Sequence, residues 1–203
     1  MSYKYTTGSL RQGDIYYEDD REGAPTFIDF SRDTISLRPS GSAILNLSAS
    51  AVGIGVTKPK VGLDSHYDPT GLANDTGGGD VVRFGAGPSG GSTTAGKLYY
   101  LDTDGQWEEA DADAIASSGV LLAIALGTTP GTHGMLLRGF FDVHSYFIGT
   151  FNEGVPVYVS TTAGSISVSA PSGGGDIVRI IGFCTTTANV IYFNPSNNTL
   201  ELT

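Results

Sequence analysis

The chain has 203 residues, of which 39% are hydrophobic and 16% charged, with 29 glycines and a formal net charge of −10. Residues 1–62 are balanced in charge, whereas residues 63–203 carry four basic and fourteen acidic side chains, so this part would repel nucleic-acid phosphates. No apolar run is long enough to span a membrane, and the first residues lack a signal-peptide pattern. We therefore expect a protein made in a cytosol, with no nucleic-acid or membrane partner.

Short alternating segments follow one another closely in the N-terminal part. They are TFIDF, TISLRP, SAILNLS and AVGIGV, at 26–30, 34–39, 42–48 and 51–56. Their spacing predicts a β meander or a β-helix-like stalk over residues 1–62. Four such strands make a thin core, so we expect the stalk to be stable as an intertwined oligomer. The tyrosines of this part make it the expected docking end: Tyr3, Tyr5, Tyr16 and Tyr17.

The rest of the chain divides into a linker and a second domain. Residues 63–96 read as a Gly/Ser/Thr-rich linker with one possible strand, VVRF. Residues 97–203 predict a C-terminal β domain, because an Asp-Gly turn joins KLYYLD to QWEEAD and one short helix is expected over 111–118. Six further strands follow, at 119–127, 134–144, 155–160, 165–170, 176–183 and 189–194. So many strands with so little helix predict an all-β chain ending in a sandwich or barrel.

Two similar strings stand out, GGGDVVRFG at 77–85 and GGGDIVRIIG at 173–182. A phosphate-binding loop needs its glycines between a strand and a helix N-terminus. Both glycine runs instead precede β-branched residues, so we expect each to be a turn that leads into a strand. In each copy the Arg follows the Asp by three residues, which places the two on opposite faces of a strand. We therefore expect Arg83 and Arg179 to pair across a strand or a subunit boundary.

Patterns of catalytic residues are absent from the sequence. GSTTAGKL at 91–98 approaches a phosphate-binding loop, but Leu98 cannot hold Mg²⁺ and a strand follows Lys97. The adjacent Glu108 and Glu109 point to opposite faces of a strand, so they cannot act together as an acid/base pair on one substrate. The three histidines lie on different segments without ligand spacing: His66, His133 and His144. We expect no enzyme, and we assign no catalytic, metal-binding or cofactor-binding residue and no cofactor.

Three further features have alternative interpretations. The acidic run DTDGQWEEADAD at 102–113 has Gly at its fourth position rather than the sixth of a calcium loop. We favour a solvated hairpin tip, and calcium binding stays open. Trp107 with Tyr99 or Tyr100 would suit stacking on a sugar, but strand packing is the commoner use of such residues. Cys184, the single cysteine, lies in an apolar run and is expected to be a buried structural thiol.

Some strings resemble known families. GSAILNLSASAVGIGVTKPKVGLD at 41–64 resembles a stretch of bacteriophage tail fibres and other virion appendages, with Val56 in place of the usual Thr. GVLLAIALG, GMLLRGFF and GVPVYVSTTAG resemble a β domain of phage capsid decoration proteins and head fibres. The resemblance implies a non-enzymatic virion protein, a homotrimeric decoration or fibre on the capsid exterior that docks on the major capsid protein or another virion protein. The alternative is a tail-fibre-like adhesin for host surface glycans, and the choice between head and tail stays open.

Overall fold

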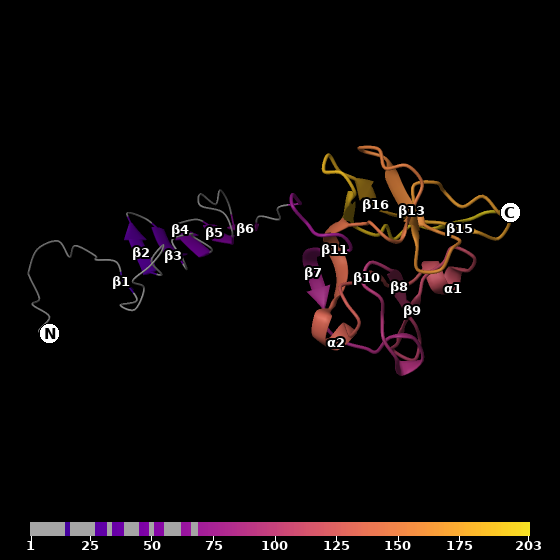
Figure 1. Cartoon of the computed structure of the whole chain (residues 1–203), viewed down its shortest axis with the longest axis horizontal. Coiled ribbons are helices and arrows are strands. Elements are labelled where there is room, and N and C mark those ends of the chain that lie inside the picture. Colours follow the sequence, from indigo (N-terminus) through magenta and orange to yellow (C-terminus); the bar gives the residue numbers. More distant parts are fainter. Residues whose placement is uncertain are drawn as a thin grey trace, which may run out of the picture. The chain divides into compact units, whose positions relative to one another are not determined.

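The structure is a computed structural model. It describes residues 69–203 and, before them, six strands at 15–16, 27–31, 34–38, 45–48, 51–54 and 62–65. The chain forms two compact units, Met1–His66 and Tyr67–Thr203, which are described separately (Figure 1). The described residues are almost entirely β, which confirms the predicted all-β class. No helix within them is both long and apolar enough to cross a membrane.

The strands of the N-terminal unit form one sheet in chain order. Antiparallel pairing joins β1 (Ile15–Tyr16), β2 (Phe27–Ser31), β3 (Thr34–Arg38), β4 (Leu45–Ser48) and β5 (Ala51–Ile54). The last strand, β6 (Gly62–Ser65), runs parallel to β5. The four expected segments are thus β2 to β5 of a meander. Among the tyrosines proposed for docking, Tyr3, Tyr5 and Tyr17 and the side chain of Tyr16 lie outside the described residues.

Strand β11 (Met135–Asp142) organises the C-terminal unit. One of its edges pairs with β7 (Gly77–Val82), with a shift in register between Leu136 and Arg138. The other edge is divided, because its first two residues pair with β10 (Leu122–Ala125) and its last four with β17 (Val190–Phe193). The ten-stranded sheet therefore splits into two branches at β11 and curls around a core.

Each branch continues by antiparallel pairing away from β11. One runs from β10 to β8 (Leu98–Leu101) and β9 (Trp107–Glu109). The other runs from β17 through β16 (Ile180–Cys184), β13 (Pro156–Val159) and β14 (Ile166–Ser167), and β12 (Phe147–Ile148) adds in parallel. A separate pair comprises β15 (Ile177–Val178) and β18 (Leu200–Glu201). The helical turns are η2 (Pro88–Gly90), α1 (Ile115–Ser118) and α2 (Pro130–His133).

The main core takes residues from both branches. Leu98 and Ile124 of one branch belong to the same buried cluster as Val157 and Phe193 of the other. Strand β10 is buried on both faces, because Ala123 and its neighbours pack in a second cluster with Trp107 and Tyr99. Each fully buried large apolar side chain contributes about 1.5–3 kcal/mol to stability. The predicted hairpin is confirmed as β8–β9, and Cys184 is buried as expected.

The chain is fastened where it joins the C-terminal unit. The Asp75 carboxylate accepts the backbone N–H of Ser145 at 2.9 Å and its hydroxyl at 2.5 Å. The Thr76 carbonyl accepts the N–H of Asp142 at 2.8 Å, and β7 follows at once. Residues 77–82 of the expected linker are therefore a strand of the C-terminal sheet, which begins four residues before VVRF.

Candidate functional site

The N-terminal sheet exposes its apolar side chains. Cross-strand pairing forms two apolar rows, one from Ile35 through Leu47 to Val52 and another from Leu37 through Leu45 to Ile54. Five of these six side chains are 37–51% exposed: Ile35, Leu37, Leu47, Val52 and Ile54. We call these six residues the apolar face. An antiparallel sheet normally packs its apolar face against the core of its own chain. Here no described residue of the same chain covers this face.

The opposite face of the same strands is polar but buried. Ser36 and Asn46 are 3% and 2% exposed and face each other across β3 and β4. The Ser36 hydroxyl donates a hydrogen bond to the Asn46 side-chain oxygen, as a buried polar pair requires. The sheet thus has the reverse of the usual arrangement, with hydroxyl and amide groups inside and aliphatic side chains outside.

The first glycine run is a strand rather than the expected turn. Gly77, Gly78 and Gly79 pair directly with Phe141, Phe140 and Gly139 of β11. A Cβ on Gly77 would lie 2.3 Å from the Phe140 carbonyl oxygen, so glycine is required by the close approach of β11. This approach is set by a segment about sixty residues away, which is why the local sequence indicated a turn.

The second glycine run does form a turn. The Asp176 carboxylate accepts the N–H of Gly173 at 2.7 Å, which closes the turn before β15. In the first copy, by contrast, Asp80 forms an ion pair at 2.6 Å with Arg138, the residue opposite it on β11. The two similar strings therefore occupy different structures.

Neither arginine of the two strings makes the expected ion pair within the described residues. The Arg83 Nε donates to the Thr132 carbonyl of α2 at 3.4 Å. Arg179 is 5% exposed and donates to three backbone carbonyls, those of Ser118, Val120 and Ser196. It therefore ties together the α1–β10 connection and the segment after β17.

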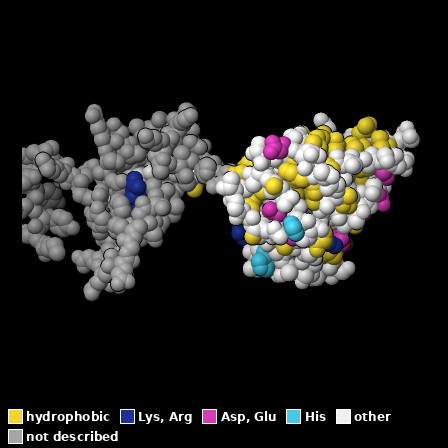
Figure 2. Space-filling model, turned by 45° about the horizontal axis from the view of Figure 1, so that its top comes forward, with side chains coloured by type: hydrophobic (Ala, Val, Ile, Leu, Met, Phe, Trp, Pro, Cys, Tyr) yellow, Lys and Arg dark blue, Asp and Glu magenta, His cyan; other side chains and the backbone are white. Residues whose placement is uncertain are grey.

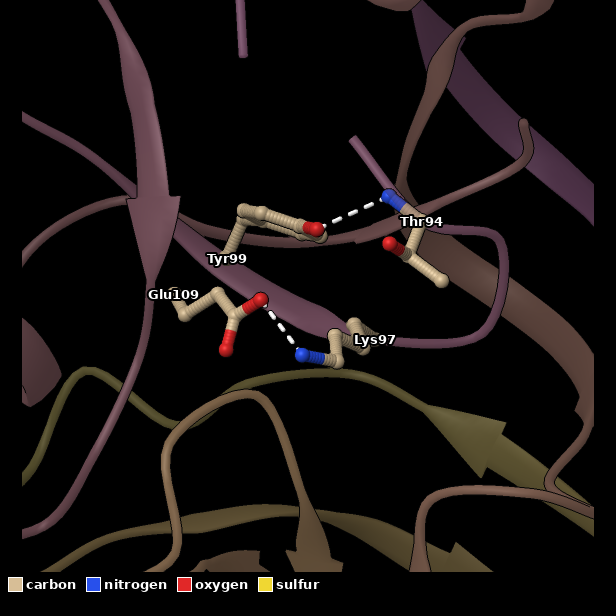
Figure 3. A network of polar contacts seen from close by, with 4 residues as sticks. All are labelled: Thr94, Lys97, Tyr99 and Glu109. Carbon is tan, nitrogen blue, oxygen red and sulfur yellow. Dashed lines mark hydrogen bonds and ion pairs between the residues drawn. The ribbon is translucent and has the colours of Figure 1, made fainter. Parts of the chain in front are cut away.

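The GSTTAGKL loop is held by side chains of the hairpin that follows it (Figure 3). Lys97 Nζ lies 2.5 Å from Glu109 Oε1, and the Tyr99 hydroxyl accepts the N–H of Thr94 at 2.8 Å. The hydrogen bond to Glu109 is the main cause that raises the pKa of Lys97, and burial raises the pKa of Tyr99. Lys97 is thus engaged by a carboxylate of its own chain, and the loop leads into β8 rather than a helix.

Two of the aromatic residues considered for sugar stacking are inaccessible. Trp107 and Tyr99 are fully buried, at 0% and 1% exposed. The indole N–H of Trp107 donates to the Phe84 carbonyl at 2.9 Å, and the two rings lie 5.5 Å apart. The favoured interpretation, strand packing, is therefore confirmed for both residues, and the stacking alternative is wrong for them, while Tyr100 is half-buried. Trp107 lies in an acidic segment, and its packing partner Phe84 lies 23 residues earlier in the chain.

The acidic run at 102–113 folds back on its own backbone. The Asp102 carboxylate accepts the N–H groups of Asp104 and Gln106, at 2.9 and 2.7 Å, and Asp111 accepts the Ser117 hydroxyl at 2.9 Å. Within the described part of the chain, no group of three or more His, Cys, Asp or Glu side chains is placed to hold a metal ion. His133 and His144 lie on α2 and after β11, and His66 lies outside the described residues.

A cleft of about 440 Å³ opens beside Arg179, and no sequence pattern predicted it. Apolar side chains of β10, β11 and the segment before β10 form part of its wall, and the segment after β17 supplies two amides. The lining residues are Gly119, Val120, Leu121, Leu122, Leu137, Arg179, Asn194, Pro195 and Asn197. On the face of this unit shown in Figure 2, hydrophobic side chains form yellow patches and charged side chains are scattered.

Comparison of the chain with protein-family profiles, with curated proteins and with solved structures finds no match. The apolar face and the Arg179 cleft are therefore interpreted from their own residues.

Proposed function

We propose that this chain is a non-enzymatic structural protein of a phage virion, a homotrimer whose N-terminal sheet assembles the subunits. The observation that carries the proposal is the apolar face on β3, β4 and β5. Aliphatic side chains exposed in contiguous rows mark surfaces that another chain covers. The resemblance of residues 41–64 to phage appendages supplies the trimeric state and the virion location.

The lack of charged residues on the apolar face favours a second copy of the same chain as the partner that covers it. Contacts around a symmetry axis bring identical residues together, so a charged face would suffer like-charge repulsion. The six residues of the apolar face carry no charge, although the chain as a whole carries −10. The net negative charge arises after residue 62, where fourteen acidic side chains face only four basic ones, and it favours a solvated outer unit.

The alternative, an adhesin for host glycans, loses two of its three candidate stacking residues. Sugar stacking requires an accessible aromatic ring, and neither Trp107 nor Tyr99 offers one. We therefore place assembly ahead of glycan binding.

The mass of the full chain in solution tests the proposal. Light scattering is expected to give three times the chain mass of 21.1 kDa. The double substitution of Leu47 and Val52 to Asp should reduce this mass to that of one chain, because six like charges would meet at the axis. Leu200→Asp is the matched control, since Leu200 is 62% exposed in the other unit. A wild-type chain that is monomeric at all concentrations overturns the assembly proposal.

The virion location needs a separate measurement. Immunogold labelling of phage particles, with a count of copies per particle, should find the protein on the capsid exterior in high copy number. A few copies confined to the tail would favour the adhesin, and unlabelled particles would contradict a virion role.

A further inference from the structure

Arg179 differs from Lys97 and Arg138 of the C-terminal unit in how its charge is balanced, and unlike the exposed Arg83 it is buried. Lys97 pairs with Glu109 and Arg138 pairs with Asp80, although the side chains of that second pair are about half exposed. Arg179 is the most buried of these cations, and no carboxylate of the described residues pairs with it. A buried charge without an opposite charge is costly, so the location of this guanidinium requires an explanation.

The hydrogen bonds of Arg179 leave part of the guanidinium unused. Nε donates to the Ser196 carbonyl at 2.7 Å, and Nη1 donates to the carbonyls of Ser118 and Val120 at 2.5 and 2.6 Å. A guanidinium has five N–H groups, so the two on Nη2 have no acceptor among the described residues. Arg179 lines the cleft, and the three carbonyls hold its planar group in one orientation there.

The cleft is suited to a small ligand with one negative charge. Its volume of about 440 Å³ falls in the range of small-molecule sites. Arg179 is its one charged lining residue, so a monoanion is neutralised there whereas a dianion retains a desolvated charge. Desolvation lowers the pKa of Arg179, which agrees with a cation that lacks a nearby acid. Asn194 and Asn197 add amide donors and acceptors, and Leu121 and Leu137 add apolar surface.

We propose that the Arg179 cleft is a binding site for a carboxylate carried on a body of about monosaccharide size. The carboxylate accepts the free N–H groups of Arg179, and the body of the ligand lies against the leucines and Pro195. Two sources share this chemistry, a sugar acid whose hydroxyls meet the asparagines and an apolar acid that contacts the leucines alone. The proposal does not depend on trimer formation or on a virion location.

A titration of the full-length protein at constant ionic strength tests the site. The probes are glucuronate and benzoate, with methyl glucoside and benzamide as their neutral counterparts. Two-dimensional NMR should show saturable shifts at the side-chain amides of Asn194 and Asn197 and at Arg179 Nε. We expect a Kd of about 1 mM for at least one acid, and binding at least about tenfold weaker for its neutral counterpart. Tighter binding of glucuronate identifies a sugar acid, and tighter binding of benzoate identifies an apolar acid.

Variants separate a binding role of Arg179 from a purely structural one. Leu121→Trp fills the cleft without removing a hydrogen bond of Arg179, and it should weaken acid binding at least about tenfold in a folded protein. Arg179→Lys keeps the charge but loses the planar donor group, and it should weaken binding similarly. Arg83→Gln, remote from the cleft lining, should leave binding unchanged. Equal shifts from the neutral probes, or no saturation by about 50 mM acid, would overturn the proposal.

Discussion

Gly79 and Gly139 face each other across β7 and β11 so closely that neither has room for a side chain. A Cβ on Gly79 would lie 2.7 Å from Gly139 Cα, and a Cβ on Gly139 would lie 2.8 Å from Gly79 Cα. Both residues have φ of +153°, which side chains rarely tolerate. Gly139 is also the first residue of β11 that pairs with β17, so the close approach lies where the second branch of the sheet begins.

Gly139→Ala is therefore expected to destabilise the protein by about 2–4 kcal/mol, through both the clash and the backbone strain. Urea unfolding followed by tryptophan fluorescence measures this change, because Trp107 is the single tryptophan. Gly78→Ala is the matched control, since a Cβ there meets nothing within 4 Å. Equal losses from both substitutions would show that strand entropy, rather than close approach, explains the glycines.

Arg179→Ala should cost about 3 kcal/mol, because three backbone carbonyls lose a charged donor. Arg138→Ala removes an ion pair whose side chains are 57% and 50% exposed, and it should cost less than about 1 kcal/mol. Thermal unfolding of the two variants beside the wild type tests this ranking. A larger loss for Arg138→Ala would contradict it.

Asp142→Asn is expected to stabilise the protein at neutral pH by about 1 kcal/mol. Asp142 is 6% exposed, its Oδ1 has no hydrogen-bond partner in the described structure, and burial raises the pKa of its carboxyl above 3.8. The folded state therefore disfavours the charged form. Consequently, the contribution of Asp142 to the free energy of unfolding is highest below pH 3.8, and it falls as pH rises through the pKa of the folded state.

Unfolding free energies measured from pH 3 to pH 8 test this sign for Asp142. The increase in unfolding free energy caused by Asp142→Asn should be largest at pH 8 and should become smaller as the pH falls. Asp104→Asn, in the exposed hairpin tip, is the control and should show no such trend. A gain that is constant with pH would exclude the titration of Asp142 as its cause.

Lys97→Met should destabilise the protein by about 1 kcal/mol at neutral pH, since it removes the contact with Glu109. The pKa of Lys97 is raised above 10.5, mainly by this hydrogen bond. Its contribution is therefore complete below pH 10.5 and is lost as pH rises through the folded pKa. The difference in unfolding free energy between wild type and variant should be level from pH 7 to 10 and decline above it. A decline that begins near neutrality would refute the assignment.

Local sequence patterns predicted where the strands lie better than they predicted which residues pack against each strand. The alternation at 97–102 and the Asp-Gly turn lie within one hairpin, so the sequence around Leu98 and Trp107 was sufficient to place β8 and β9. Whether a strand is covered on one face or on both depends on distant segments. Strand packing was expected for Trp107, but its partners Phe84 and Met135 lie on distant segments that the sequence around Trp107 does not identify.

The Arg179 cleft also depends on residues that are far apart in the sequence. Its lining comes from the segments around 120, 137, 179 and 195, and no sequence spacing relates them. The sequence singled out Arg179 through the repeated glycine string, yet that string behaves differently in its two copies. Glycine permits both the turn at Gly173 and the strand at Gly79, so composition alone does not distinguish the two.

The fastening of residues 75–82 to β11 has a mechanical consequence. The chain is continuous between the two units, so tension applied from the N-terminal unit reaches the Asp75 contacts before it reaches the Gly77 end of β7. There the carboxylate contacts with Ser145 and the Thr76–Asp142 hydrogen bond bear the load before the sheet does. Tension would have to break this clamp before β7 could be peeled from β11.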